Sequence, residues 1–201
     1  LMGGLRLEQR SARSDQIDLA IAATLLDDGR PDEAATVLDG IGRAELATEE
    51  QARFDGLVLR AAGGDAGAMA EAAGAVSRRA TADGGAALIE ALSTALDRLD
   101  ARARTDGIRP DAEANGAELL PLAEALEYWL RQQEVEDAGA WSLVADARCR
   151  SGEHAAALVI YDRLLKAHPS AGSLLAGRAQ ALFDAGDPTG LADAMSIYRR
   201  L

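Results

Sequence analysis

A helix–turn–helix pattern occurs twice within residues 138–201, with a repeat period of about 34 residues. The first copy has small and aromatic residues at helical spacing on both sides of the turn glycine Gly152. The second has Ala179 before Gly186, and Ala194 and Tyr198 after it are displaced by about three residues. A hairpin built this way is too thin to bury its own apolar face, so it must stack on neighbouring hairpins. The pattern therefore predicts stacked helical hairpins. The residues that define it are Trp141, Ala145, Gly152, Ala157, Tyr161, Pro169, Gly186, Ala194 and Tyr198.

Helical periodicity continues upstream of this pair, and residues with high strand propensity never alternate over a convincing run. Aromatic residues make up only 3% of the chain, which favours close helix packing through alanine and leucine. We therefore predict an all-α chain of about five antiparallel hairpins. The expected parts are a polar lead-in over residues 1–13 and one repeat domain over 14–201, which comprises degenerate repeats over 14–82, an irregular helical pair with a loop at 105–116 over 83–134, and the clear pair over 138–201.

The defining residues of 138–201 resemble the tetratricopeptide repeat, although Arg148 stands where that family usually has a tyrosine. The resemblance is good over 138–201 and loose over 15–72. It implies a right-handed α-solenoid whose first helices line a concave groove that holds a peptide or a partner's helix. An alanine-rich helical bundle is the alternative. The residues whose helical phase points into the implied groove are Arg53, Leu57, Arg60, Asp146, Cys149, Arg150, Gln180, Phe183 and Asp184.

One subtype of the family clamps a C-terminal carboxylate with lysines and asparagines in the groove. Lys166 and Asn115 are the single lysine and the single asparagine of this chain, and neither falls at a matching position. We therefore do not expect that mode of binding.

The formal net charge of −12 argues against nucleic acid as a partner, because neutralising phosphates requires a basic face. It also argues against docking on anionic lipid. No apolar run is long enough to span a bilayer, so we expect no membrane insertion. The ends of the sequence suggest a fragment of a longer protein. We expect a cytoplasmic location, with a periplasmic or secreted one as the alternative.

The sequence offers little for catalysis or for cofactor binding. No glycine-rich turn ends in Gly-Lys-Ser/Thr, and no serine lies in a Gly-x-Ser-x-Gly turn. A metal site would draw on Cys149, His154 and His168, but Cys149 and His154 lie on opposite sides of the Gly152 turn. We predict a non-enzymatic chain with no cofactor and no metal.

The sequence thus favours a protein–protein adaptor or scaffold that binds a peptide or partner helix in its groove. The alternative is a regulatory or sensory domain that holds a neighbouring catalytic or membrane domain of a larger protein. The last apolar stripe should be covered by missing sequence or by another copy of the chain, which makes self-association through the C-terminal helix an expectation. That stripe consists of Met195, Ile197, Tyr198 and Leu201.

Overall fold

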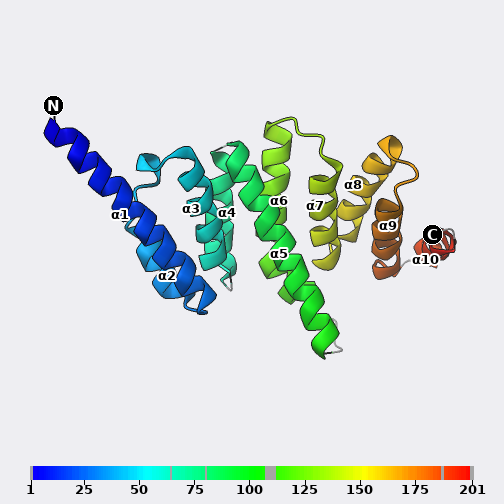
Figure 1. The fold of residues 1–201 in the computed structure, drawn as a ribbon. Helices are drawn as coiled ribbons and strands as arrows, with labels where there is room; N and C mark the ends of the chain where they lie inside the picture. The colour runs from blue at the N-terminus through cyan, green and yellow to red at the C-terminus, as the bar shows by residue number, and fades with distance from the viewer. Residues whose placement is uncertain (1, 64, 80, 107–111, 187, 200–201) are drawn as a thin grey trace. The chain divides into compact units, whose positions relative to one another are not determined.

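The computed structural model describes the backbone of residues 2–63, 65–79, 81–106, 112–186 and 188–199, and the side chains of these ranges except 2–13, 102, 105–106, 112–117 and 188–189. Within the described residues it contains ten α-helices, one 3-10 helix and no strand (Figure 1). The all-α prediction is confirmed. No helix in this part of the chain has the length and apolar character needed to cross a membrane.

The chain divides into two compact units, Leu1–Ala91 and Leu92–Leu201, and the boundary falls inside one long helix. Unit 1 holds α1 (Met2–Asp27), α2 (Pro31–Asp39), η1 (Arg43–Glu45), α3 (Thr48–Ala61), α4 (Ala66–Arg78) and the start of α5 (Ala82–Asp106). Unit 2 holds the rest of α5, then α6 (Ala112–Gln132), α7 (Ala138–Arg150), α8 (His154–Ala167), α9 (Gly172–Asp184) and α10 (Pro188–Tyr198). Whether residues 14–201 behave as one domain stays a prediction.

Three hairpin turns have a glycine with a positive φ angle. Gly29, Gly152 and Gly186 have φ values of 72°, 83° and 68°, in the left-handed region that glycine adopts without a steric penalty. After Gly152, the N–H of Glu153 donates to the carbonyl of Arg148 over 2.8 Å. This bond closes the end of α7 and sends the chain directly into α8.

Two helix starts, those of α4 and α7, are capped by an aspartate side chain that accepts a hydrogen bond from the first turn. Asp65 Oδ1 accepts from the N–H of Ala68 over 2.8 Å at α4, and Asp137 Oδ1 accepts from the N–H of Ala140 over 2.7 Å at α7. Each bond satisfies a donor that has no partner within its helix.

In unit 1, α1 packs against α2 and α3, and α3 packs against α4. One cluster of its core contains leucine, alanine, one isoleucine and one phenylalanine. Its buried residues are Leu19, Ala22, Ala34, Leu38, Ile41, Leu46, Phe54 and Leu57.

In unit 2, consecutive helices from α6 to α10 pack against one another, and α7 also contacts α9. The small pattern residues Ala145 and Ala157 are fully buried, so neighbouring helices approach closely there. Trp141 is 3% exposed; its Nε1–H donates to the carbonyl of Val135 over 2.9 Å, and the guanidinium of Arg163 lies 3.8 Å from the centre of its ring.

Two expected boundaries are wrong. The first helix begins at Met2, within the expected lead-in of residues 1–13, because residues 5–13 contain strong helix formers and no proline. The expected loop at 105–116 is shorter: α5 runs to Asp106 and α6 starts at Ala112, leaving 107–111 outside the described residues. Alanine and glutamate around Asn115–Gly116 outweigh the turn preference of that dipeptide.

Candidate functional site

Five predicted groove residues lie together on one surface of unit 2, which we call the α7–α9 face. It is formed by Asp146, Cys149 and Arg150 of α7 with Gln180 and Asp184 of α9, although the buried side chain of Cys149 itself offers almost no surface to a partner. Cys149 Sγ lies 3.9 Å from Asp184 Oδ2, a contact that joins the two helices. α7 and α9 are the first helices of the two repeat copies, so their helical phase predicted this meeting.

Asp146 connects the α7–α9 face to α8. The hydroxyl of Tyr161, on α8, donates to Asp146 Oδ1. Burial raises the pKa of the Asp146 carboxyl above its ordinary value of 3.8, while the hydrogen bond from Tyr161 and the charge of Arg150 act in the opposite direction. Tyr161 itself is 1% exposed, and burial together with the charge of Asp146 raises its phenol pKa.

The Cys149 thiol is enclosed by carboxylates. Its side chain is 6% exposed, and burial followed by the charges of Asp184 and Asp146 raises its pKa to about 12. A nucleophilic cysteine needs the opposite environment, one that favours the thiolate. The thiol of this face therefore stays protonated at neutral pH.

The outer edge of the face is polar and carries two exposed aromatic residues, Tyr198 and Phe183. Gln180 Nε2 donates to both carboxylate oxygens of Asp184, over 2.8 and 2.9 Å, and the Tyr198 hydroxyl donates to Gln180 Oε1 over 3.2 Å. Phe183 lies beside them in sequence on α9 and is 50% exposed. An exposed phenylalanine next to ordered donors and acceptors can contact an apolar side chain of a partner.

Two arginines of α7 tie the face to other helices. Arg150 pairs with Asp100 of α5. Arg148, which stands where the repeat family usually has a tyrosine, pairs with Glu127 of α6 over 2.6 Å and with Glu153 of the turn. Its ion pairs connect α6 to the α7–α8 turn, so at this position an arginine held by two ion pairs stands in place of the tyrosine.

The three groove residues predicted in unit 1 do not form such a cluster. Arg53 is exposed, and Arg60 forms an exposed ion pair with Asp27 over 2.7 Å. Leu57 is 5% exposed and belongs to the core of unit 1, so its side chain offers almost no surface to a partner.

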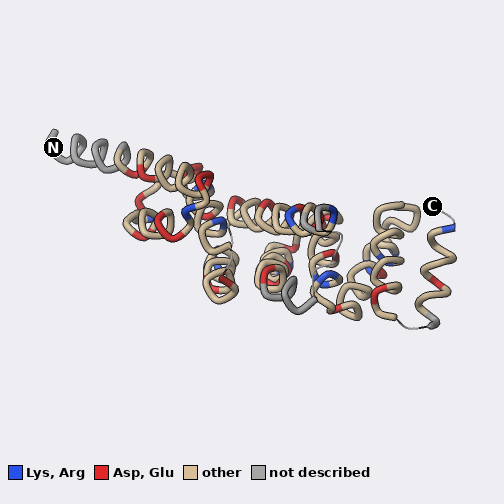
Figure 2. Tube along the Cα trace, turned by 90° about the horizontal axis from the view of Figure 1, so that it is seen from below, with Lys and Arg blue, Asp and Glu red and all other residues tan. Residues whose placement is uncertain are grey.

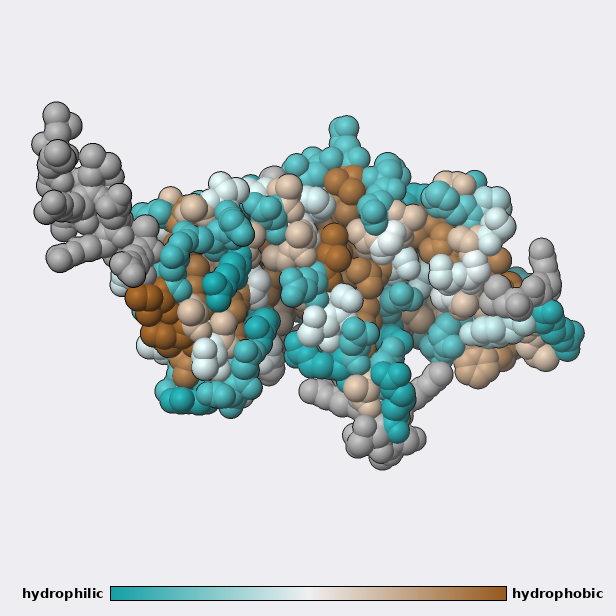
Figure 3. All heavy atoms as spheres, viewed as in Figure 1, coloured by the Kyte–Doolittle hydropathy of each residue, from teal (hydrophilic) through white to brown (hydrophobic). Residues whose placement is uncertain are grey.

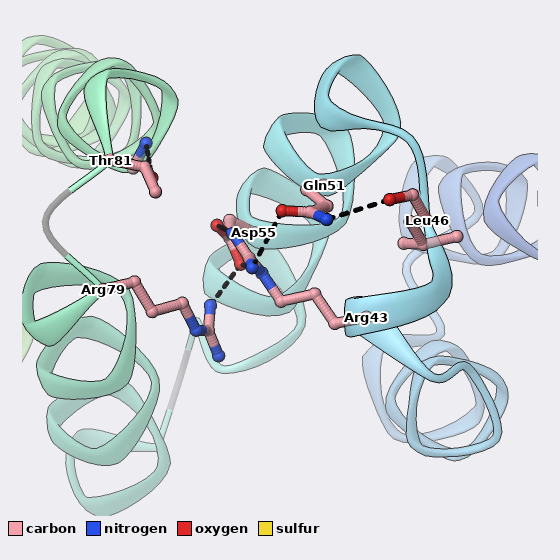
Figure 4. A network of polar contacts seen from close by, with 7 residues as sticks. Arg43, Leu46, Gln51, Asp55, Arg79 and Thr81 are labelled. Atoms are coloured by element: carbon pink, nitrogen blue, oxygen red, sulfur yellow. Dashed lines mark hydrogen bonds and ion pairs between the residues drawn. The ribbon is translucent and has the colours of Figure 1, made fainter.

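Sequence reasoning missed the most buried charged group of the described residues. Asp55 of α3 is fully buried, and Figure 4 shows arginine side chains reaching it from two sides. Arg43 binds it with two bonds, Nε to Oδ1 over 2.8 Å and Nη2 to Oδ2 over 2.6 Å, and Arg79 donates to Oδ1. Gln51 adds an acceptor for Arg43 over 3.1 Å. This buried ion-pair network connects η1, α3 and the end of α4, so it holds these three elements of unit 1 together.

The structure brings Cys149 and His154 closer than the sequence indicated. Because the Gly152 turn is tight, Cys149 Sγ lies 3.8 Å from His154 Nδ1. In the described part of the chain, no group of three or more histidine, cysteine, aspartate and glutamate residues is placed to hold a metal ion.

Comparisons with protein-family models, curated proteins and solved structures found no match for this chain. The resemblance to the tetratricopeptide repeat therefore rests on the residues of the chain itself.

Proposed function

We propose that this chain is a tetratricopeptide-like helical-repeat protein that acts as an adaptor and binds a peptide or partner helix over the α7–α9 face. The observation that carries the proposal is the meeting of five groove residues from two successive first helices, with Cys149 and Asp184 in contact at its centre. Repeat proteins use neighbouring first helices in this way, because each contributes side chains to one continuous surface.

The chemistry of the face supports a peptide ligand rather than a reaction. Asp146, Gln180 and Asp184 are held by hydrogen bonds within the protein, so the surface is ordered before a partner arrives. A preorganised surface loses less side-chain entropy on binding. Phe183 supplies an apolar contact next to these polar groups.

Selection of binding peptides from a random displayed library tests the proposal. The selected peptides should bind the wild-type chain and lose at least tenfold in affinity to a Phe183→Gln variant. Val159→Gln is the matched control, because Val159 is 70% exposed on α8 and lies outside the α7–α9 face. Equal affinity for both variants would place the binding elsewhere. Failure to select any peptide would count against the adaptor function.

A further inference from the structure

Exposed apolar side chains alone do not determine which kind of peptide the α7–α9 face accepts. Figure 3 shows hydrophobic residues at the surface over the α1–α2 hairpin of unit 1 as well, so such residues are not confined to this face. Charge discriminates between ligands more sharply, because complementary charges favour the right partner and like charges repel the wrong one. The charged groups of the α7–α9 face therefore indicate the chemical class of its ligand.

Asp184 brings a negative charge to the place where α9 meets α7. Figure 2 shows α9 as a mostly uncharged helix, and its two charged residues are Arg178 and Asp184. Arg178 pairs with Asp162 of α8 over 2.6 Å. Asp184 instead accepts hydrogen bonds from Gln180 and contacts the protonated thiol of α7, and both of these donors are neutral. The hydrogen bonds hold the carboxylate in place without cancelling its charge.

The Cys149 thiol reports the electrostatic potential at the centre of the face. After burial, the charges of Asp184 and Asp146 are the largest causes that raise its pKa to about 12. The charge of Arg150 acts in the opposite direction and has a smaller effect than either carboxylate. The potential at the junction of α7 and α9 is therefore negative.

The guanidinium groups near the face do not reverse this potential. Arg150 pairs with Asp100 of α5, and Arg199 is exposed just beyond the end of α10. Two guanidinium groups thus stand against three carboxylates, those of Asp100, Asp146 and Asp184. The chain as a whole has a net charge of −12, which attracts cationic ligands over a longer range.

Two exposed aromatic side chains lie beside the Asp184 carboxylate. Phe183 precedes Asp184 on α9, and Tyr198 of α10 donates to Gln180, which in turn binds Asp184. Arginine and lysine side chains match such an edge, because their methylene stems pack on aromatic rings while their cationic groups attract carboxylates.

We infer that the peptide bound over the α7–α9 face carries a basic side chain, arginine or lysine, whose cationic group lies against the Asp184 carboxylate and whose stem packs on Phe183. This inference rests on the function proposed above and names the chemical class of its ligand. An acidic side chain at the same place in the peptide is repelled by Asp184 and Asp146, so the face discriminates between peptides by charge.

Three displayed peptide libraries test this charge preference. They share one design, in which a central position is fixed as arginine, glutamine or glutamate and all other positions are random but exclude charged residues. Selection on the wild-type chain should recover the most binders from the arginine library, fewer from the glutamine library and the fewest from the glutamate library.

A double-mutant cycle with a selected arginine peptide locates the contact. Replacing its arginine by glutamine should weaken binding to the wild-type chain about three- to tenfold, and should have much less effect on binding to Asp184→Asn. Asp193→Asn is the control, because it removes an exposed carboxylate of α10 outside the face and should respond to the peptide change as the wild type does. Added salt should weaken binding of the arginine peptide more than that of the glutamine peptide. Circular dichroism checks that both variants keep their helix content.

Two results would overturn the charge preference and leave the adaptor function standing. The first is equal recovery from the three libraries of peptides whose affinity still depends on Phe183. The second is an arginine-to-glutamine effect that is the same for the wild type and for Asp184→Asn. Recovery of no binder from any library would contradict the adaptor function and the charge preference together.

Discussion

Tyr161 fills the space that a side chain at residue 177 would need. A Cβ atom built on Gly177 would lie 2.5 Å from the hydroxyl oxygen of Tyr161 and 2.6 Å from its Cζ. The ring of α8 thus packs directly against the backbone of α9, and its hydroxyl continues to Asp146 of α7. One aromatic side chain positions three helices under the α7–α9 face.

We expect Gly177→Ala to destabilise unit 2 by about 1–3 kcal/mol, because the added methyl group collides with a buried ring that cannot move aside. Urea unfolding followed by tryptophan fluorescence measures this, since both tryptophans, Trp129 and Trp141, lie in unit 2. Gly56→Ala is the matched control. It lies in α3 of unit 1 with no atom within 4 Å of the added Cβ, so it should not lower the unfolding midpoint that the tryptophans report. Equal effects of the two changes would refute the packing argument.

Asp55→Asn should destabilise unit 1 strongly, by about 3–5 kcal/mol, because it removes the anion that neutralises two partly buried guanidinium groups. Hydrogen exchange of the amides in α3 and α4 is the suitable measurement. Asp27→Asn breaks the exposed pair with Arg60 and should cost about 0–1 kcal/mol. Amide exchange in α3 and α4 that stays as slow in Asp55→Asn as in the wild type would show that the ion-pair network of Asp55 does not stabilise unit 1.

The sequence predicted those features that depend on local pattern. Gly29, Gly152 and Gly186 were identifiable as turn residues, because few other residues adopt a positive φ after a helix without strain. Helical phase and the period of about 34 residues between α7 and α9 assigned residues of both helices to one predicted groove, and the binding of a partner there stays a prediction. The number of hairpins and the buried side of each clear helix come from the same periodicity.

The features that depend on distant partners could not be predicted. Asp55 looks like an ordinary surface aspartate in the sequence, since its arginine partners stand 12 and 24 residues away. The tie between Arg150 and Asp100 spans 50 residues. Pairings of this kind follow from the path of the chain, and no local pattern specifies them. Leu57, which was predicted to face the groove, lies in the core of unit 1 through hydrophobic packing with residues that are also distant in the sequence.

The raised pKa of Asp146 predicts a pH dependence of stability. The folded chain holds this proton more tightly than the unfolded chain, so the contribution of Asp146 is most favourable below its ordinary pKa of 3.8 and is lost as the pH rises through the folded value. The unfolding free energy of the wild type should therefore fall relative to that of Asp146→Asn as the pH rises from about 4 to about 7. Urea titrations at several pH values measure this difference.

Two further variants isolate the cause of that pH dependence. Tyr161→Phe removes a hydrogen bond that lowers the pKa of Asp146, so it should raise this pKa further and move the pH-dependent loss to higher pH. Asp193→Asn, at an exposed position on α10, is the control and should leave the profile unchanged. A pH-independent difference between wild type and Asp146→Asn would contradict the argument.

The Cys149 thiol should resist alkylation in the folded protein. With a pKa of about 12, only about one thiol in ten thousand is ionised at pH 8, against roughly a quarter for an ordinary cysteine. Iodoacetamide labelling followed by mass spectrometry should therefore be at least a thousandfold slower in buffer than in urea. Asp184→Asn removes a nearby negative charge that raises the thiol pKa, so it should speed labelling of the folded chain, whereas Asp193→Asn should not. Labelling of the folded wild type at the rate seen in urea would show that Cys149 is neither buried nor held against the carboxylates of the α7–α9 face.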